Sequence, residues 1–186
     1  MNSAFAVQRA PTVQDGHAAS STVLLFATTL SLLTASSEAA VLFVRTNGND
    51  ALPGTSWSDA KRTVWAAIGV AAGGDEIWVA QGTYGEHLIL KPDVALYGGF
   101  TGSEATRVAR DWTNRLSVLW GTTNKVVVNI TNAGPATRLD GFTIGGGNGI
   151  HGGGIAMVGS GPVIVNNTIR NNITDGAGSG ISIWGF

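Results

Sequence analysis

The sequence predicts an all-β fold in which short strands stack as the coils of a β-solenoid. The strongest indication is a repeat: LDGFTI (Leu139 to Ile144) returns as IVNNTI (Ile164 to Ile169) 25 positions later, and GGGIAM (Gly152 to Met157) returns as GSGISI (Gly178 to Ile183) 26 positions later. Short apolar-alternating segments that recur in one order are typical of stacked repeats. The composition agrees, because 27 glycines with 44% hydrophobic and 12% charged residues make the chain rich in turns and too apolar for disorder.

Alternate residues of the repeats are expected to point into the solenoid, where each coil covers the same positions of the next coil. This predicted inward set is Leu139, Ile144, Ile155, Met157, Ile164, Ile169, Ile181 and Ile183. Asparagine pairs at 166–167 and 171–172 occupy the predicted turns, because Asn tolerates left-handed backbone. The glycine runs 145–147 and 152–154 allow sharp bends and lack the Lys-Ser/Thr ending of a phosphate-binding loop.

Residues 1–39 are predicted to be a signal peptide with an upstream leader. Thr22 to Thr34 is an uncharged apolar run, shorter than the ~20 residues of a membrane span, and small residues follow it. Cleavage is expected after Ala39. Met1 to Ser21 is long and carries Arg9 as its one fixed positive charge, which indicates a true start codon further downstream. An uncleaved membrane anchor and a helix of the mature fold are the alternatives.

Residues 40–74 are predicted to form one strand, Val41 to Arg45, and then one helix after the turn-rich segment Thr46 to Trp57. The apolar face of the helix follows three- and four-residue spacing through Val64, Ala67, Ile68 and Ala71. The predicted boundary signals are Ser56 or Ser58 as the cap, Asp59 in the first turn, and Gly73 and Gly74 at the end.

Residues 75–186 are predicted to hold the β-helix coils, because every segment there is short and strand-like. Before the repeats, the predicted strands are Glu76 to Ala80, His87 to Leu90, Val94 to Phe100, Ser117 to Gly121 and Lys125 to Ile130. Phe186 follows a strand in mid-coil, and a solenoid needs a cap over its last edge. The chain is therefore expected to be an N-terminal fragment that is truncated at its C-terminal end.

Several motifs resemble one family. They are GTSW (Gly54 to Trp57), DEIWVAQGTY (Asp75 to Tyr84), LYGGFTGSE (Leu96 to Glu104), RDW (Arg110 to Trp112) and the LDGFTI-type repeats. In this order they resemble the secreted bacterial right-handed parallel β-helix proteins of the pectate-lyase-like superfamily, over roughly Leu42 to Phe186. The resemblance implies a right-handed solenoid whose early helix caps the open N-terminal end. The family holds lyases, glycosidases and adhesins, so the fold implies no single reaction.

Charge and cysteine content exclude several functions. The net charge of −1 supplies no basic field for nucleic acid, so no nucleic-acid partner is expected. The absence of cysteine excludes disulfides, Cys-ligated zinc and thiol nucleophiles. The histidines stand alone in the sequence without a second ligand at metal spacing, namely His17, His87 and His151. No cofactor or metal is predicted from these residues.

The acidic residues do not predict a catalytic site. Within the repeats, Asp140 and Asp175 are 35 positions apart and so need not face each other, and the acidic cluster of a calcium-dependent lyase is missing. Lys125 and Arg170 could act as a base or bind a uronate, but outward solvated positions explain them as well. A hydrolase needs two carboxylates roughly 5 to 10 Å apart. The acids that could converge for this purpose are Glu86, Asp93, Glu104 and Asp111.

Other polar and aromatic residues favour structural roles. The set Glu104, Arg107, Arg110 and Asp111 is predicted to form a salt-bridged excursion that pins the GGF loop to the helix. Asn47, Asn49 and Asp50 could hold a structural Ca²⁺, but a plain turn fits their spacing better. Trp120 and Trp184 could stack on sugar rings, although packing at coil corners is the preferred interpretation. Asn129, Asn166 and Asn172 begin N-x-Thr sequons.

Two functional hypotheses follow, and the catalytic residues stay unknown in both. The first is an exported scaffold, secreted or at the cell surface, that associates with polysaccharide or a cell-surface glycan without catalysis. The alternative is the N-terminal part of a polysaccharide lyase or glycoside hydrolase whose active site lies on later coils. Acid-poor, nearly neutral repeats favour the first hypothesis, and the family resemblance together with export motivates the second.

Overall fold

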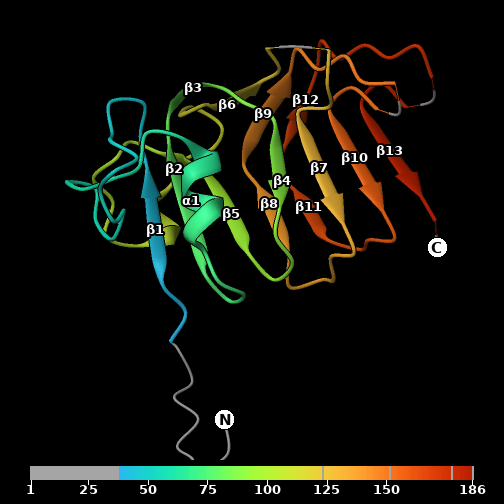
Figure 1. Cartoon of the computed structure of the whole chain (residues 1–186). Coiled ribbons are helices and arrows are strands. Elements are labelled where there is room, and N and C mark those ends of the chain that lie inside the picture. The colour runs from blue at the N-terminus through green and yellow to red at the C-terminus, as the bar shows by residue number, and fades with distance from the viewer. Residues whose placement is uncertain (1–37, 123, 151, 177, 186) are drawn as a thin grey trace, which may run out of the picture. The chain divides into compact units, whose positions relative to one another are not determined.

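Three parallel sheets wind around one apolar interior in the computed structural model, which describes residues 38–122, 124–150, 152–176 and 178–185 (Figure 1). Sheet A contains β1 (Val41–Val44), β2 (Glu76–Ala80), β5 (Ala95–Phe100), β8 (Arg138–Asp140) and β11 (Val163–Val165). Sheet B contains β3 (Gly82–Gly85), β6 (Ser117–Trp120), β9 (Phe142–Gly145) and β12 (Thr168–Ile169). Sheet C contains β4 (Leu88–Leu90), β7 (Val128–Thr131), β10 (Ile155–Val158) and β13 (Ile181–Trp184).

Successive strands enter the three sheets in turn, so that β2, β3 and β4 form one coil and β5, β6 and β7 form the next. Every strand pair is parallel, as stacking of coils requires. One short α-helix accompanies them in the described part of the chain. The predicted class, an all-β parallel β-helix with a helix near its N-terminal end, is confirmed. The predicted leader falls almost wholly on residues 1–37, which lie outside the described residues.

The sequence repeats coincide with the strand register. Ile164 pairs with Leu139 and Ile169 with Ile144, which are the positions related by the first repeat. Ile181 pairs with Ile155 and Ile183 with Met157, as the second repeat requires. The repeated residues therefore stack directly on one another, because one period of sequence makes one turn of the solenoid.

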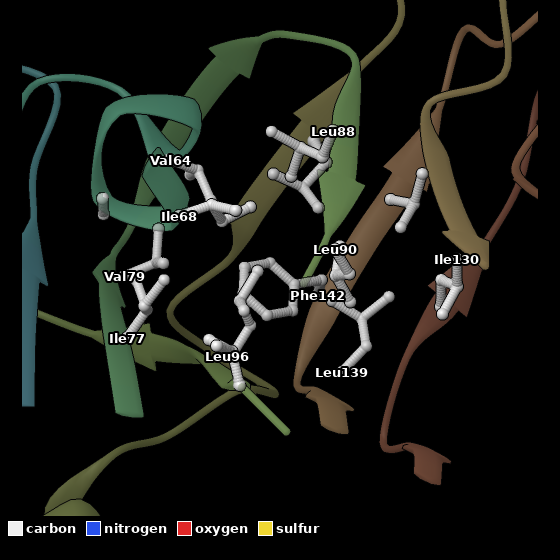
Figure 2. Packing of buried hydrophobic residues seen from close by; sticks show 14 of the residues in the cluster. Val64, Ile68, Ile77, Val79, Leu88, Leu90, Leu96, Ile130, Leu139 and Phe142 are labelled. Atoms are coloured by element: carbon white, nitrogen blue, oxygen red, sulfur yellow. The ribbon is translucent and has the colours of Figure 1, made fainter. Parts of the chain in front are cut away.

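The interior is filled by side chains from all three sheets and the helix. Figure 2 shows Val64 and Ile68 of the helix facing the same interior as Ile77 and Val79 of β2 and Leu88 of β4. The largest side chains that are almost fully buried include Leu96, Leu119, Ile130, Leu139, Phe142 and Ile144. Each contributes about 1.5–3 kcal/mol by leaving water.

The helix α1 (Val64–Val70) buries the predicted face, but its start was predicted incorrectly. Thr63 is the N-cap, and its hydroxyl accepts the N–H of Ala66 at 3.1 Å. Ser56 lies instead in a loop where Asp59 accepts its N–H at 2.7 Å. The segment before Thr63 cannot be helical, because Lys61 forms a parallel bridge with Val44 of β1. The helix also ends before Gly73, with Ala71 as the C-cap.

A second apolar cluster lies on the outer face of sheet A. Trp78 and Phe100 stack with ring centroids 4.8 Å apart, and Phe43 meets Trp57 edge-on at 4.7 Å. The indole N–H of Trp57 donates to the Glu104 carbonyl at 2.9 Å. The GTSW and GGF motifs are thus explained by packing, since Trp57 of the first and Phe100 of the second, at the end of β5, meet in this cluster.

The excursion after β5 is anchored to sheet A and not to α1. Arg107, in the short 3₁₀ helix η1 (Arg107–Ala109), pairs with Glu76 of β2. Arg110 pairs with Asp140 of β8 at 2.8 Å. Glu104 and Asp111, predicted as internal partners of these arginines, instead accept backbone N–H groups of their own loops. The predicted salt-bridged excursion is therefore wrong in its partners, because oppositely charged residues on the neighbouring sheet are within reach.

Candidate functional site

A groove of about 760 Å³ lies on the outer face of sheet C. Its floor is one row of outward side chains, Ile89 of β4, Asn129 of β7 and Ala156 of β10, which the strand register places directly beside one another. Figure 1 shows these strands next to each other, with β13 beyond them. Adjacent strands are about 4.8 Å apart, so the row repeats on a scale comparable with a sugar ring.

Two side chains from β10 and β13 form the end of the groove nearest the last coil. Val158 and Trp184 are paired in register and both line the groove. Trp184 is 41% exposed, so part of its indole ring faces the groove and solvent. An indole face on solvent can stack against the C–H face of a sugar ring.

The wall of the groove is the segment before β7, including Asn124, Lys125 and Val126. The imidazole of His87 holds this wall, because its Nδ1 donates to the Val126 carbonyl at 2.9 Å and a carbonyl can only accept. Gly149 and Ile150, in the segment before β10, extend this wall, since Gly149 lies directly against Val126. The groove is thus formed by segments of successive coils rather than by one continuous stretch of sequence.

The electrostatic character of the groove is simple. Lys125 is exposed and is the one Lys or Arg side chain among the described residues that line it, and no carboxylate lines it. Most of the lining is apolar, with amides at Asn124 and Asn129. The arrangement suits binding through stacking and amide hydrogen bonds, and it does not place two carboxylates for hydrolysis.

The acids predicted as possible catalytic groups are not brought together. Asp140 lies on the outer face of sheet A, where Arg110, Arg138 and Asn166 donate to its carboxylate at 2.8, 3.1 and 2.8 Å. Asp175 is an exposed residue of the loop after β12. Asp140 is therefore a structural residue, and its buried carboxylate is fully engaged by its neighbours.

The four acids of the N-terminal coils also stay apart, and three of them cap backbone. Glu86 accepts the N–H groups of Val64 and Trp65 at 2.9 and 2.7 Å. Burial raises the pKa of Glu86, and those two N–H bonds oppose the rise. Glu104 and Asp111 cap loops, and Asp93 occupies a turn with a φ of 61°.

Asp50, the candidate calcium residue, is a capping residue. Its Oδ1 accepts the N–H groups of Arg62 and Thr63 at 2.8 and 2.9 Å, and its Oδ2 accepts the Thr63 hydroxyl. Burial acts to raise the pKa of Asp50, but these hydrogen bonds outweigh it, and the pKa lies below its ordinary value. Within the described part of the chain, no cluster of three or more His, Cys, Asp or Glu side chains is placed to hold a metal ion.

The two candidate tryptophans have different roles. A Cβ atom on Gly145 or Gly146 would lie within 2.7 Å of the Trp120 ring, so Trp120 packs flat on the glycine backbone of the next coil. Trp184 lines the groove instead. The preferred interpretation of packing fits Trp120, and the ligand-stacking alternative fits the position of Trp184.

The remaining candidates are also separated. Among the sequons, Asn166 donates to Asp140 and Asn172 donates to the Ile144 carbonyl at 3.1 Å, whereas Asn129 is exposed in the groove. Arg170 is exposed outside the groove lining. His17 and His151 lie outside the described residues.

Sequence reasoning missed Ile89 and Ala156 as groove residues. In each strand, the residue next to a predicted inward residue points outward. Comparing these outward residues between coils in register could have found the groove. That comparison requires the register between β4 and β7, which precedes the visible repeats. No helix among the described residues is long and apolar enough to cross a membrane.

One comparison with known proteins gives a result. The model of a family named DUF1565 and described as a protein of unknown function matches residues 46–183. No curated protein and no solved structure matches the chain. The matched range contains α1, Trp120 and the described lining residues of the sheet C groove except Trp184, which lies one position beyond its end.

Proposed function

The chain belongs to the DUF1565 family, and we propose that it is an exported β-helix scaffold that binds polysaccharide or a cell-surface glycan in the sheet C groove. The scaffold acts outside the cell or on its surface. It holds the glycan along the row of strands and performs no chemistry on it.

The observation that carries this proposal is the combination of Trp184 with exposed amides in one open groove. A glycan chain needs aromatic surface for its C–H faces and side-chain amides for its hydroxyl groups. Trp184, Asn124 and Asn129 supply both kinds of contact, and Lys125 adds a cation. The hollow of about 760 Å³ falls within the 300–1,000 Å³ range of small-ligand sites.

Export is supported by where the fold begins. The apolar run Thr22 to Thr34 precedes a predicted cleavage point after Ala39, and β1 starts at Val41. Removal of residues 1–39 would therefore leave every described strand and α1 intact.

The alternative is the N-terminal part of a polysaccharide lyase or glycoside hydrolase. Lys125 favours it, because a lysine in a glycan groove could act as a base on the carbon beside a uronate. The absence of carboxylates from the described groove lining favours binding without hydrolysis. A catalytic role would place the acidic residues on coils beyond those described.

A binding experiment tests the proposal. The full chain is titrated by calorimetry with a panel of soluble plant and bacterial polysaccharides, and Trp184→Ala is compared with Trp65→Ala. Trp65 is a matched control, because it is 65% exposed on α1 and does not line the groove. We expect Trp184→Ala to weaken binding at least about tenfold, which is about 1.4 kcal/mol, and Trp65→Ala to leave it unchanged.

Two results would contradict the proposal. Absence of binding to the whole panel, or equal weakening by both variants, would show that the groove is not a glycan site. New reducing ends or unsaturated products during the titration, lost in Lys125→Ala, would favour the enzyme instead.

A further inference from the structure

We propose that cleavage after Ala39 creates an N-terminal ammonium group that pairs with the buried carboxylate of Asp75. The inference rests on the export part of the proposed function and concerns what processing does to the fold. The backbone nitrogen of Ala40, which becomes the new terminus, lies 2.8 Å from Oδ1 of Asp75.

Asp75 is a buried acid whose described partners are backbone amides. The residue is 7% exposed, at the turn that leads into β2. Its Oδ1 accepts the N–H of Ala40, and its Oδ2 accepts the N–H of Ala72 at 2.8 Å. None of the ion pairs among the described residues involves Asp75. A buried carboxylate without a cation is costly, because its charge has left water without compensation.

Ala40 is held at this place by the sheet. Its carbonyl accepts the N–H of Glu76 at 2.9 Å, and Val41 then begins the ladder with β2. Glu38, Ala39 and Ala40 are exposed, so the bond to be cut is accessible. The Ala40 nitrogen would therefore stay beside Asp75 after cleavage.

Hydrolysis changes the charge of that nitrogen. Water adds its hydroxyl to the Ala39 carbonyl carbon, the bond from that carbon to the Ala40 nitrogen breaks, and the nitrogen leaves as an amine. The new Ala39 carboxylic acid loses its proton and the amine gains one, since an α-amino group has a pKa of about 7.7–8.0. The neutral N–H donor becomes an N⁺–H donor to the same oxygen, and charge-assisted hydrogen bonds are roughly twice as strong as neutral ones.

The competing explanation is that Asp75 is only a turn residue. In that case an asparagine, which keeps an acceptor oxygen for the Ala40 N–H, would serve nearly as well before and after cleavage. The two explanations differ in one respect: only the ion pair makes the effect of Asp75→Asn depend on processing.

The experiment compares exported and unprocessed protein. The chain is produced once with export and once in the cytosol as the full unprocessed chain, and intact masses establish where each begins. Thermal unfolding midpoints are then measured for wild type and for Asp75→Asn in both forms, as a double-mutant cycle. Asp175→Asn is the control, because Asp175 is an exposed acid in a loop far along the chain.

We expect the exported wild type to begin at Ala40 and to unfold several degrees above the unprocessed chain. We expect that difference to disappear in Asp75→Asn and to persist in Asp175→Asn. An equal gain on processing in wild type and Asp75→Asn would overturn the inference while leaving export intact. Export with cleavage elsewhere would also overturn it. Retention of residues 1–39 inside the cell would overturn the export proposal, and the inference with it.

Discussion

The two ends of the solenoid differ in how their exposed backbone and apolar side chains are treated. At the N-terminal end, the segment after β1 folds back along its free edge. Phe43 donates its N–H to the Gly54 carbonyl at 2.8 Å, and its own carbonyl accepts the N–H of Lys61 at 2.9 Å. The first edge of sheet A is thereby paired, which prevents it from acting as a template for other strands.

The helix covers the interior at the same end. Val64, Ala67 and Ile68 are at most 5% exposed and pack on the core. Both ends of α1 are tied to the first coil, since Glu86 accepts two N–H groups at its start and Lys91 donates to the Gly69 and Ala71 carbonyls at its end. The expectation that this helix caps the N-terminal end is consistent with these contacts.

The other end has no such cover among the described residues. β11, β12 and β13 are the last strands of their sheets. Ile181 and Ile183 are 39% and 49% exposed, although Ile155 and Met157, their partners one coil earlier, are 0% and 6% exposed. The same apolar alternation thus produces core where a further described coil covers it and exposed surface where the described residues supply no such coil.

The largest expected effect comes from substituting equivalent positions in successive coils. Ile155→Asp places an unpaired carboxylate in the core and should lower the free energy of unfolding by about 4 kcal/mol or more. Ile181→Asp, one coil later in the same register, should cost less than about 1 kcal/mol because its side chain reaches water. Urea unfolding measures both values. Similar costs would show that the last coil is covered in solution.

The N-terminal cap is tested by Glu86→Ala. Removing the carboxylate leaves the N–H groups of Val64 and Trp65 without their acceptors, which should cost about 1–2 kcal/mol of unfolding free energy. Glu86→Gln keeps one acceptor oxygen, so its free energy of unfolding should fall by about half as much. The midpoints of urea unfolding compare the three proteins, and an unchanged midpoint in Glu86→Ala would mean that α1 does not stabilise this end.

The two acids around α1 should respond to pH in opposite directions. The pKa of Asp50 lies below 3.8 in the fold, so its stabilisation is present above that pH and is lost as the pH falls through the folded value. The pKa of Glu86 is raised above 4.5, so its contribution is complete below pH 4.5 and is lost as the pH rises through the folded value.

Thermal unfolding between about pH 3 and about pH 6 checks these signs. In Asp50→Asn, the unfolding midpoint should fall less steeply than in wild type as the pH drops. In Glu86→Gln, the midpoint should fall less steeply than in wild type as the pH rises. A steeper acidic loss in Asp50→Asn than in wild type would contradict the assigned direction for Asp50.

The last prediction concerns association through the C-terminal end. Uncovered strand edges with apolar side chains favour pairing with other chains. Ile183→Asp should lower the association constant roughly tenfold in sedimentation at increasing concentration. Ile89→Asp is the control, because Ile89 is 67% exposed on β4, away from the last coil. Equal association of both variants would assign the contact to another surface.

Local signals predicted the stacked coils correctly and the helix boundary incorrectly. Residues one period apart, such as Leu139 and Ile164, reveal their pairing because the repeat length equals one turn of the solenoid. Ser56 has the right chemistry for a cap and lies near the helix, but Thr63 is used. Thr63 is the cap because Asp50 accepts its N–H and because Lys61, just before it, is bridged to Val44 of β1. Both contacts join residues that are distant in sequence.

The charged residues of the excursion show the same limit. Arg110 is near Glu104 and Asp111 in sequence, yet its partner is Asp140, 30 positions away. The guanidinium carbon of Arg110 lies 5.1 Å from the ring centroid of Tyr97 and 4.5 Å from the ring centroid of Trp112. Partners of this kind come from stacking different coils, and no local pattern encodes them.

Apolar alternation, glycine and asparagine turns and a constant period are enough to specify a stack of parallel coils, because burial of alternate residues depends only on chain geometry that repeats with each turn. The groove over sheet C, the capping acids and the contact between Ala40 and Asp75 are different. Each joins side chains or backbone atoms that become neighbours only when coils lie in register, so the folded arrangement, and not the order of residues, decides which of them meet.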